Sequence, residues 1–140
     1  RYRRRQENTG RKAGNIAEFC ATYGAEYDFM IVLDAVLVVV FSTFGRGAHS
    51  EGLGVAQVWG TAWPFLVGLA VGWLVLLAGR REPSSIGSGV LLWLATLVVG
   101  MVIRGLGDGR VPHWSFMIVA GVVTGVFLVG WRAVLVRRRR

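Results

Sequence analysis

The sequence lacks most of what a secreted scaffold or a soluble enzyme needs. Its single cysteine, Cys20, allows no disulfide within the chain. Charged residues make up only 17% of the 140 positions, and they form no Ser/His/Asp or Cys/His arrangement typical of catalysis. No glycine-rich loop follows a strand pattern in the way that phosphate binding requires. We therefore expect no catalytic residues, no enzyme activity and no cofactor.

Apolar residues are abundant instead, at 54% of the chain. A small water-soluble domain cannot bury so many, and a lipid bilayer is the better solvent for them. A helix needs roughly 20 apolar residues to cross the ~30 Å hydrocarbon layer. Four runs approach that length and are separated by segments rich in glycine, proline or charge. They predict an all-α membrane protein, a bundle of four transmembrane helices at about residues 28–44, 59–78, 86–103 and 115–136.

Basic residues cluster at the ends of these runs. With the termini and the middle loop on one side, thirteen of the sixteen Lys and Arg residues fall there, against Arg46, Arg104 and Arg110 opposite. Positive charge favours the cytoplasmic side, so both termini are predicted to be cytoplasmic. Residues 1–27 form a basic arm, either an amphipathic helix on anionic lipid or a solvated segment, and residues 137–140 form a basic tail.

The same basic runs contain no aromatic residue except Tyr2, and they adjoin the membrane spans. Nucleic acid is therefore not an expected partner. The six tryptophans are expected to form interfacial belts, with Trp59, Trp63 and Trp114 on the outer side and Trp73, Trp93 and Trp131 on the inner side.

The first span contains one carboxylate, Asp34, in the stretch FMIVLDAVLVVVF. An unpaired charge there costs at least ~2.5 to 3.5 kcal/mol, so Asp34 is predicted either to face the bundle and pair or to be protonated. At ~1.5 Å per residue it shares its depth with Trp73 and Trp93 and lies within reach of Arg132. If it pairs, its predicted partner is Trp73, Trp93 or Arg132.

Two roles for Asp34 follow, one in pairing helices and one in transport of a proton or ion. Transport usually requires a polar stripe, but the neighbours of Asp34 on its helical face are apolar: Met30, Ile31, Leu37, Val38 and Phe41. We favour the structural role. On that interpretation Asp34→Asn is expected to be mild, because the amide still accepts a hydrogen bond, and Asp34→Leu disruptive.

Small residues mark two helix faces suited to close packing. Gly68 and Gly72 form one G-x-x-x-G face on the second span, and Gly121 and Gly125 form another on the fourth. We expect the second span to pack through this face on the fourth span or on a partner protein. Pro64, one turn inside the second span, is expected to kink or restart the helix.

Polar residues also lie in the segments predicted to be extracytoplasmic, namely Arg46, His49, Glu51, Arg104, Asp108 and His113. Four of them could in principle hold a divalent metal, but their spacing is not that of a known site. A surface charge network is the preferred interpretation, with no metal.

Four stretches together resemble a known family: LDAVLVVVFSTFGRGAHSEG, GTAWPFLVGLAVGW, GMVIRGLGDG and SFMIVAGVVTGVFLVGWRA. They are similar to the uncharacterised four-helix, mostly actinobacterial membrane proteins of domain of unknown function 3054, over about residues 28–133. The resemblance implies the four-helix topology and the bacterial plasma membrane, and carries no activity. It singles out the residues to test first: Asp34, Arg46, His49, Thr61, Trp63, Pro64, Arg104, Trp131 and Arg132.

Two function classes remain. The preferred one is a non-catalytic accessory subunit that binds other membrane proteins in a larger complex, a respiratory complex being one example. The alternative is a small carrier or channel for protons or ions that uses Asp34 and is a homo-oligomer, because four helices enclose little space. A lipid-handling enzyme using His49 and Glu51 is a distant third.

Overall fold

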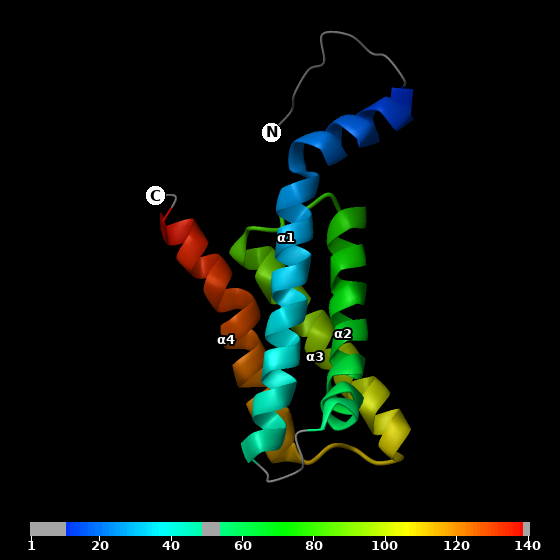
Figure 1. The fold of residues 1–140 in the computed structure, drawn as a ribbon, viewed down its shortest axis with the longest axis vertical. Coiled ribbons are helices and arrows are strands. Elements are labelled where there is room, and N and C mark those ends of the chain that lie inside the picture. The colour runs from blue at the N-terminus through cyan, green and yellow to red at the C-terminus, as the bar shows by residue number, and fades with distance from the viewer. Residues whose placement is uncertain (1–10, 49–53, 139–140) are drawn as a thin grey trace.

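The computed structural model describes residues 11–48 and 54–138, with side chains at 26–45 and 54–138. It contains four helices, α1 (Arg11–Ala48), α2 (Val55–Ala78), α3 (Ile86–Asp108) and α4 (Trp114–Arg138) (Figure 1). No strand occurs in these ranges. The all-α prediction is confirmed, and each of the four predicted spans lies inside one of the helices.

Local sequence explains where the helices begin and end. The Ser85 side chain caps α3 by accepting a hydrogen bond from the backbone N–H of Ser88 at 3.1 Å. Gly109 ends the same helix in the left-handed conformation, with φ 64°, which glycine adopts without strain. At the start of α2, the Gln57 side chain accepts from the Gly54 N–H at 3.0 Å.

All four helices are long and apolar enough to cross a membrane, over Glu26–Gly45, Val55–Ala78, Ile86–Asp108 and Trp114–Arg138. The first of these belongs to a longer helix, because α1 runs unbroken from Arg11. Figure 1 shows the first turns of α1 inclined to the rest. Residues 1–10 and 139–140 of the predicted arm and tail lie outside the described residues.

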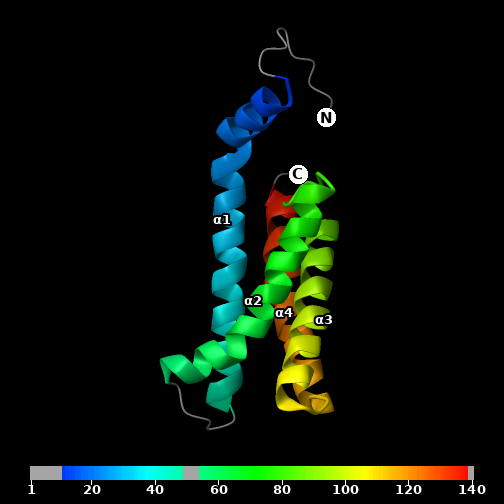
Figure 2. The ribbon, with the colours of Figure 1, turned by 90° about the vertical axis from the view of Figure 1, so that its right-hand side faces the viewer.

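The helices form a ring in chain order. The backbone of α1 lies next to α2 and α4, and that of α3 lies next to α2 and α4, while in the described residues the diagonal pairs approach only through side chains, such as Phe65 of α2 and Phe116 of α4. Figures 1 and 2 show the start of α1 and the end of α4 at the same end of the bundle. Side chains from all four helices fill the centre, including Val38, Phe65, Leu92 and Leu128.

The glycine face of α2 packs on α3, and the prediction that it packs on α4 or on a partner protein was wrong. A Cβ built on Gly68 would lie 2.8 Å from the Thr96 carbonyl oxygen, and one on Gly72 would lie 3.1 Å from the Cβ of Ala95. Both neighbours belong to α3. A short loop joins α2 to α3 and makes them antiparallel neighbours, whereas α2 and α4 lie diagonally across the ring.

The second glycine face, on α4, also meets α3. A Cβ on Gly125 would lie 3.2 Å from the Trp93 indole, and a Cβ on Gly121 would lie 3.6 Å from Leu97. The Trp93 Nε1–H donates to the Gly121 carbonyl oxygen at 2.8 Å. On this face the missing side chains make room for an indole ring from the neighbouring helix.

Pro64 lies inside α2, which remains one continuous helix. Figure 2 shows the first turns of α2 swinging away from the axis of the rest, as the missing N–H of a proline predicts. The next residue, Phe65, is fully buried and packs where a Cβ on Gly100 of α3 would lie 2.6 Å from its ring. The bend therefore coincides with a tight contact between α2 and α3.

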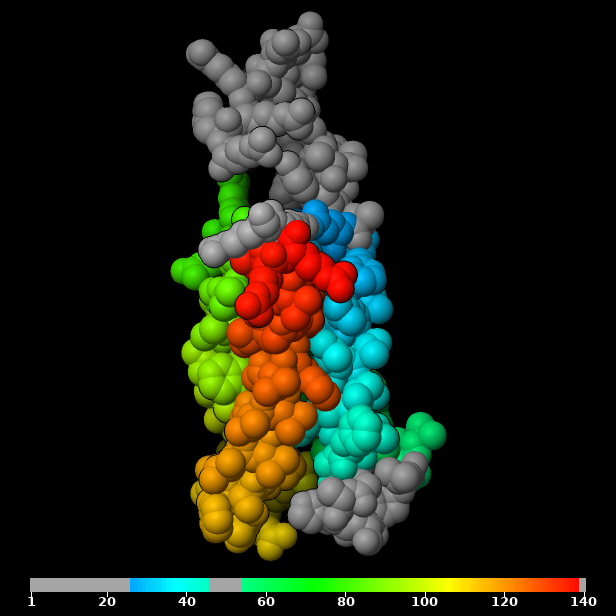
Figure 3. All heavy atoms as spheres, turned by 90° about the vertical axis from the view of Figure 1, so that its left-hand side faces the viewer, coloured from blue at the N-terminus to red at the C-terminus, as the bar shows by residue number. Residues whose placement is uncertain are grey.

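The outer faces of the bundle are apolar. Val36 of α1 and Val122 and Val126 of α4 are each more than half exposed, at 51%, 60% and 63%. Figure 3 shows α4 and α1 side by side on one such face. Exposed apolar surface of this kind suits contact with lipid tails.

Candidate functional site: a buried ion pair with two tryptophans

The buried face of α1 places Asp34 in the bundle core. Met30, Asp34, Val38 and Ser42 recur every four residues, and all are buried, with Asp34 at 0% exposure. Residues four apart share one face of a helix. The same spacing that buries the apolar neighbours of Asp34 therefore buries its carboxylate.

The partner of Asp34 is Arg132 of α4, which is also fully buried. The Arg132 Nη1–H donates to Oδ1 at 2.9 Å, and the Nη2–H donates to Oδ2 at 2.7 Å. Two parallel bonds of this kind match the planar guanidinium to the planar carboxylate, and they are the strong form of the pair. They join the first helix to the last, 98 residues apart.

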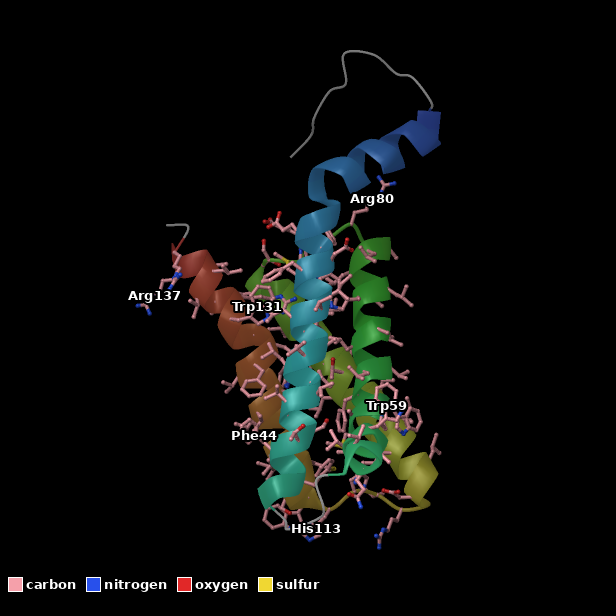
Figure 4. All side chains as sticks on the ribbon, viewed as in Figure 1. Phe44, Trp59, Arg80, His113, Trp131 and Arg137 are labelled. Atoms are coloured by element: carbon pink, nitrogen blue, oxygen red, sulfur yellow. The ribbon has the colours of Figure 1, made fainter. Side chains whose placement is uncertain are left out.

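Two tryptophans complete the environment of the carboxylate. The Trp73 Nε1–H of α2 donates to Oδ2 at 3.2 Å, and the Trp131 Nε1–H of α4 donates to Oδ1 at 3.0 Å. Each oxygen thus accepts one guanidinium and one indole hydrogen bond. A carboxylate has about four lone-pair positions, so its capacity as an acceptor is used. Figure 4 shows Trp131 between α4 and α1.

Arg132 makes further contacts that tie in the α2–α3 loop. Its Nε–H donates to the Pro83 carbonyl oxygen at 2.8 Å, and its Nη1 donates a second bond to the Leu128 carbonyl oxygen at 2.7 Å. The guanidinium carbon lies 4.3 Å from the centre of the Trp131 ring. Gly89 of α3 makes the space, because a Cβ there would lie 2.8 Å from the Arg132 side chain.

These contacts explain how two charges are tolerated at this depth. Desolvation of a buried ion pair is repaid only where the geometry is good and the remaining polar atoms are bonded, and both conditions hold here. Among the described side chains, the one buried polar atom without a hydrogen-bond partner is the Thr96 hydroxyl. The pair links α1, α2, α4 and the α2–α3 loop at one point.

The structure brings two of the three predicted partners to Asp34, namely Trp73 and Arg132. The other candidate, Trp93, is not a partner, because its indole donates to the Gly121 carbonyl oxygen of α4 instead. Trp131 was missed as a partner and was assigned to an interfacial belt instead. Depth along a helix gives the height of a side chain but not the direction in which it points.

The tryptophan belts divide in the same way. The three outer tryptophans are exposed, Trp59 at 60%, Trp63 at 42% and Trp114 at 66%, which fits contact with lipid headgroups. The three inner ones donate their indole N–H to groups inside the bundle. The inner tryptophans therefore link helices of the bundle, and burial contradicts the belt interpretation for Trp73, whereas Trp93 and Trp131 are half-buried.

The predicted extracytoplasmic cluster is described only in part. The side chains of Arg46, His49 and Glu51 lie outside the described residues. Arg104, Asp108 and His113 line one cavity at the end of the bundle away from Arg137, which Figure 4 shows by the positions of His113 and Arg137. The Arg104 Nε lies 3.7 Å from Asp108 Oδ2. No group of three His, Cys, Asp or Glu in the searched residues could hold a metal.

Four helices that can cross a bilayer, closed around a fully paired buried charge, define a multi-pass α-helical membrane protein. The chain belongs to the family described as Protein of unknown function (DUF3054), whose model matches residues 31–135. The matched segment contains Asp34, Trp73, Trp131 and Arg132, and it confirms the resemblance seen in the sequence.

The chain is also similar to part of Glucans biosynthesis glucosyltransferase H from Shewanella sp. (strain ANA-3) and from Shewanella baltica (strain OS185). Each match is 52% identical over 42 residues, which is 30% of this chain and 6% of the relative. The chain thus spans a small fraction of the length of these curated relatives. No solved structure matches the chain.

Proposed function

We propose that this chain is a non-catalytic accessory subunit of a larger complex in the bacterial plasma membrane, and that the Asp34–Arg132 pair fixes the shape that its partners bind. The observation that carries the proposal is the closure of Asp34. Both carboxylate oxygens are saturated by donors and the side chain has 0% exposure. A residue held in this way is suited to holding helices together.

The same observation argues against a carrier that uses Asp34. A transported proton or cation must reach the carboxylate and find a free lone pair on it. Here it would have to displace a guanidinium or an indole, and so break the link between α1 and α4. The neighbours of Asp34 one turn away in each direction, Met30 and Val38, are buried and apolar, and they provide no relay.

One observation favours the alternative, a small oligomeric carrier or channel. A cavity enters the bundle from the end that carries the α3–α4 loop, and all four helices line it. An entry of this kind on one side is what the first half of a transport path would need. Phe41 and Phe116 in its wall, and Phe65 behind them, separate it from the level of Asp34.

The two proposals are separated by purification of the full chain from its native membrane in a mild detergent. We expect larger membrane proteins to travel with it in fixed proportion, and an Arg132→Leu variant to lose them together with its own stability. As a matched control, Arg137→Leu removes an exposed arginine from the same helix and is expected to keep them. Purification of the chain only as a homo-oligomer would contradict the accessory role and favour the carrier or channel.

A further inference from the structure

The cavity at the end of the bundle, which we call the vestibule, has a volume of about 700 Å³. Phe41 of α1, Thr61 of α2, Arg104 of α3 and Phe116 of α4 all line it. Its volume lies in the range of sites that hold small molecules. Asp34 does not line the vestibule. What the vestibule binds is therefore independent of the proposed accessory role.

The wall of the vestibule toward the core is aromatic. The Phe41 and Phe65 rings meet edge to face with centroids 5.5 Å apart, and Phe65 and Phe116 lie 6.3 Å apart. Phe65 is fully buried behind the two lining rings. Val119 of α4 extends the apolar lining. One part of the vestibule therefore suits hydrocarbon.

Positive charge predominates in the rest of the lining. Among the described lining residues, Arg104 and Arg110 face a single carboxylate, Asp108. The Arg104 guanidinium rests on the Phe116 ring, 4.8 Å from its centre, and its 3.7 Å distance to Asp108 is too long for a hydrogen bond. Within the residues that the structure describes, this guanidinium donates no hydrogen bond to the protein. Its one polar contact among the described residues is the ion pair of its Nε with Asp108, which leaves the Nη1 and Nη2 donors able to reach a ligand.

Two other polar groups in the vestibule already have hydrogen-bond partners. The His113 Nδ1 is 2.7 Å from the Ser115 hydroxyl oxygen, and the Ser42 hydroxyl donates to the Val38 carbonyl oxygen at 3.0 Å. The arginines are thus the groups best able to take a ligand. An arginine with unbonded Nη donors, and two cations against one carboxylate in the described lining, favour an anion, and phosphate oxygens match the spacing of the arginine donors.

We propose that the vestibule binds an anionic amphiphile through a phosphate group. The phosphate bonds to Arg104 with Arg110 beside it, and the hydrocarbon of the same molecule packs on Phe41, Phe116 and Val119. A free phosphate ion would accept hydrogen bonds from the arginine but would leave the apolar wall exposed to water. A molecule with both parts covers both surfaces, and lipid is at hand because α3 ends at this level of a membrane-spanning bundle.

The test compares three ligands on the purified full chain in neutral detergent, with the midpoint of thermal unfolding as readout. Dioleoyl phosphatidic acid carries both the phosphate and the chains, dioleoylglycerol lacks the phosphate, and glycerol 3-phosphate lacks the chains. Only the first is expected to raise the midpoint in a saturable way. Arg104→Gln is expected to weaken this binding by about tenfold or more, because a charge-assisted bond is lost.

Two further variants keep the test decisive. Arg137→Gln makes the same substitution on an exposed arginine at the other end of the bundle and is expected to bind like wild type. Val119→Trp fills the vestibule without changing charge and is expected to abolish binding, which decides the matter if Arg104→Gln does not fold.

Four outcomes would overturn the proposal. Equal binding of glycerol 3-phosphate would make the vestibule a site for a free anion, and equal binding of dioleoylglycerol would make it an apolar site. If Arg137→Gln weakened binding as much as Arg104→Gln, the effect would be due to general surface charge. Undiminished binding in Val119→Trp would place the lipid elsewhere on the protein.

Discussion

The two carboxylate oxygens of Asp34 accept four hydrogen bonds from three residues. This number of bonds determines how much a substitution of Asp34 destabilises the protein. Each oxygen faces one guanidinium N–H and one indole N–H. An asparagine in either orientation would turn its amide N–H2 toward two donors. The expectation from sequence that Asp34→Asn is mild assumed a single acceptor bond, and the geometry no longer supports it.

We therefore predict that Asp34→Asn destabilises the protein nearly as much as Asp34→Leu. Removing one member of a buried pair leaves an uncompensated charge, and the expected loss is about 3 to 5 kcal/mol of unfolding free energy. Detergent unfolding of both variants measures it. Asp28→Asn makes the same change at an exposed position of α1 and is expected to be neutral. An Asp34→Asn variant as stable as wild type would show that residue 34 needs no negative charge.

The tryptophans allow a matched comparison. Trp131→Phe removes a hydrogen bond to a charged acceptor, whereas Trp93→Phe removes one to a backbone carbonyl, and both side chains are half-buried. Bonds to charged groups contribute about 1.5 to 3 kcal/mol, and neutral ones about 0.5 to 1.5 kcal/mol. Trp131→Phe should therefore lower the unfolding free energy more. Equal losses would mean that the Trp131 indole contributes by packing alone.

Sequence reasoning identified the carboxylate and its arginine because charge is expensive in hydrocarbon and must find a partner. It did not separate Trp93 from Trp131. Successive helix residues turn by about 100°, so two indoles at similar depth can face different neighbours. Only the packing of α4 against both α1 and α3 decides which one reaches Asp34.

Among the helices, span lengths were predictable and helix partners were not. Bilayer thickness sets the length of an apolar run, so hydropathy alone located all four spans. A G-x-x-x-G face indicates that another helix can approach closely, but it does not indicate which helix that is. Gly68 and Gly72 meet Thr96 and Ala95 of α3 because the α2–α3 loop is short.

Close approach at Gly68 gives a prediction for α2. In Gly68→Ala the new Cβ would lie 2.8 Å from the backbone oxygen of Thr96, and backbone cannot rotate away as a side chain can. The helices must separate, at an expected cost of about 1 to 3 kcal/mol in unfolding free energy. Gly60→Ala on the same helix meets nothing within 4 Å and is expected to be neutral or slightly stabilising. Equal effects of the two substitutions would show that the α2–α3 contact is loose.

For the molecule as a whole, charge and shape differ between the two ends of the bundle. Arg80, Arg81, Arg137 and Arg138 lie at the end where the membrane span of α1 begins and α4 ends, and the buried ion pair joins the helices nearer that end. The vestibule, with Arg104 and Arg110, lies at the other end. We infer that the first of these ends faces the cytoplasm, because among the described residues it carries more arginines than the vestibule end.

This orientation predicts which loops a membrane-impermeant thiol reagent reaches in intact cells. In a Cys20→Ser background, Val111→Cys places a thiol in the α3–α4 loop, where the side chain is 81% exposed. It is expected to react from outside. Glu82→Cys, exposed in the α2–α3 loop, is expected to react only after the cells are permeabilised. Both substitutions leave every arginine in place, so the charge distribution that orients the chain is preserved. The reverse labelling pattern would put the vestibule in the cytoplasm, where its lipid would come from the inner leaflet.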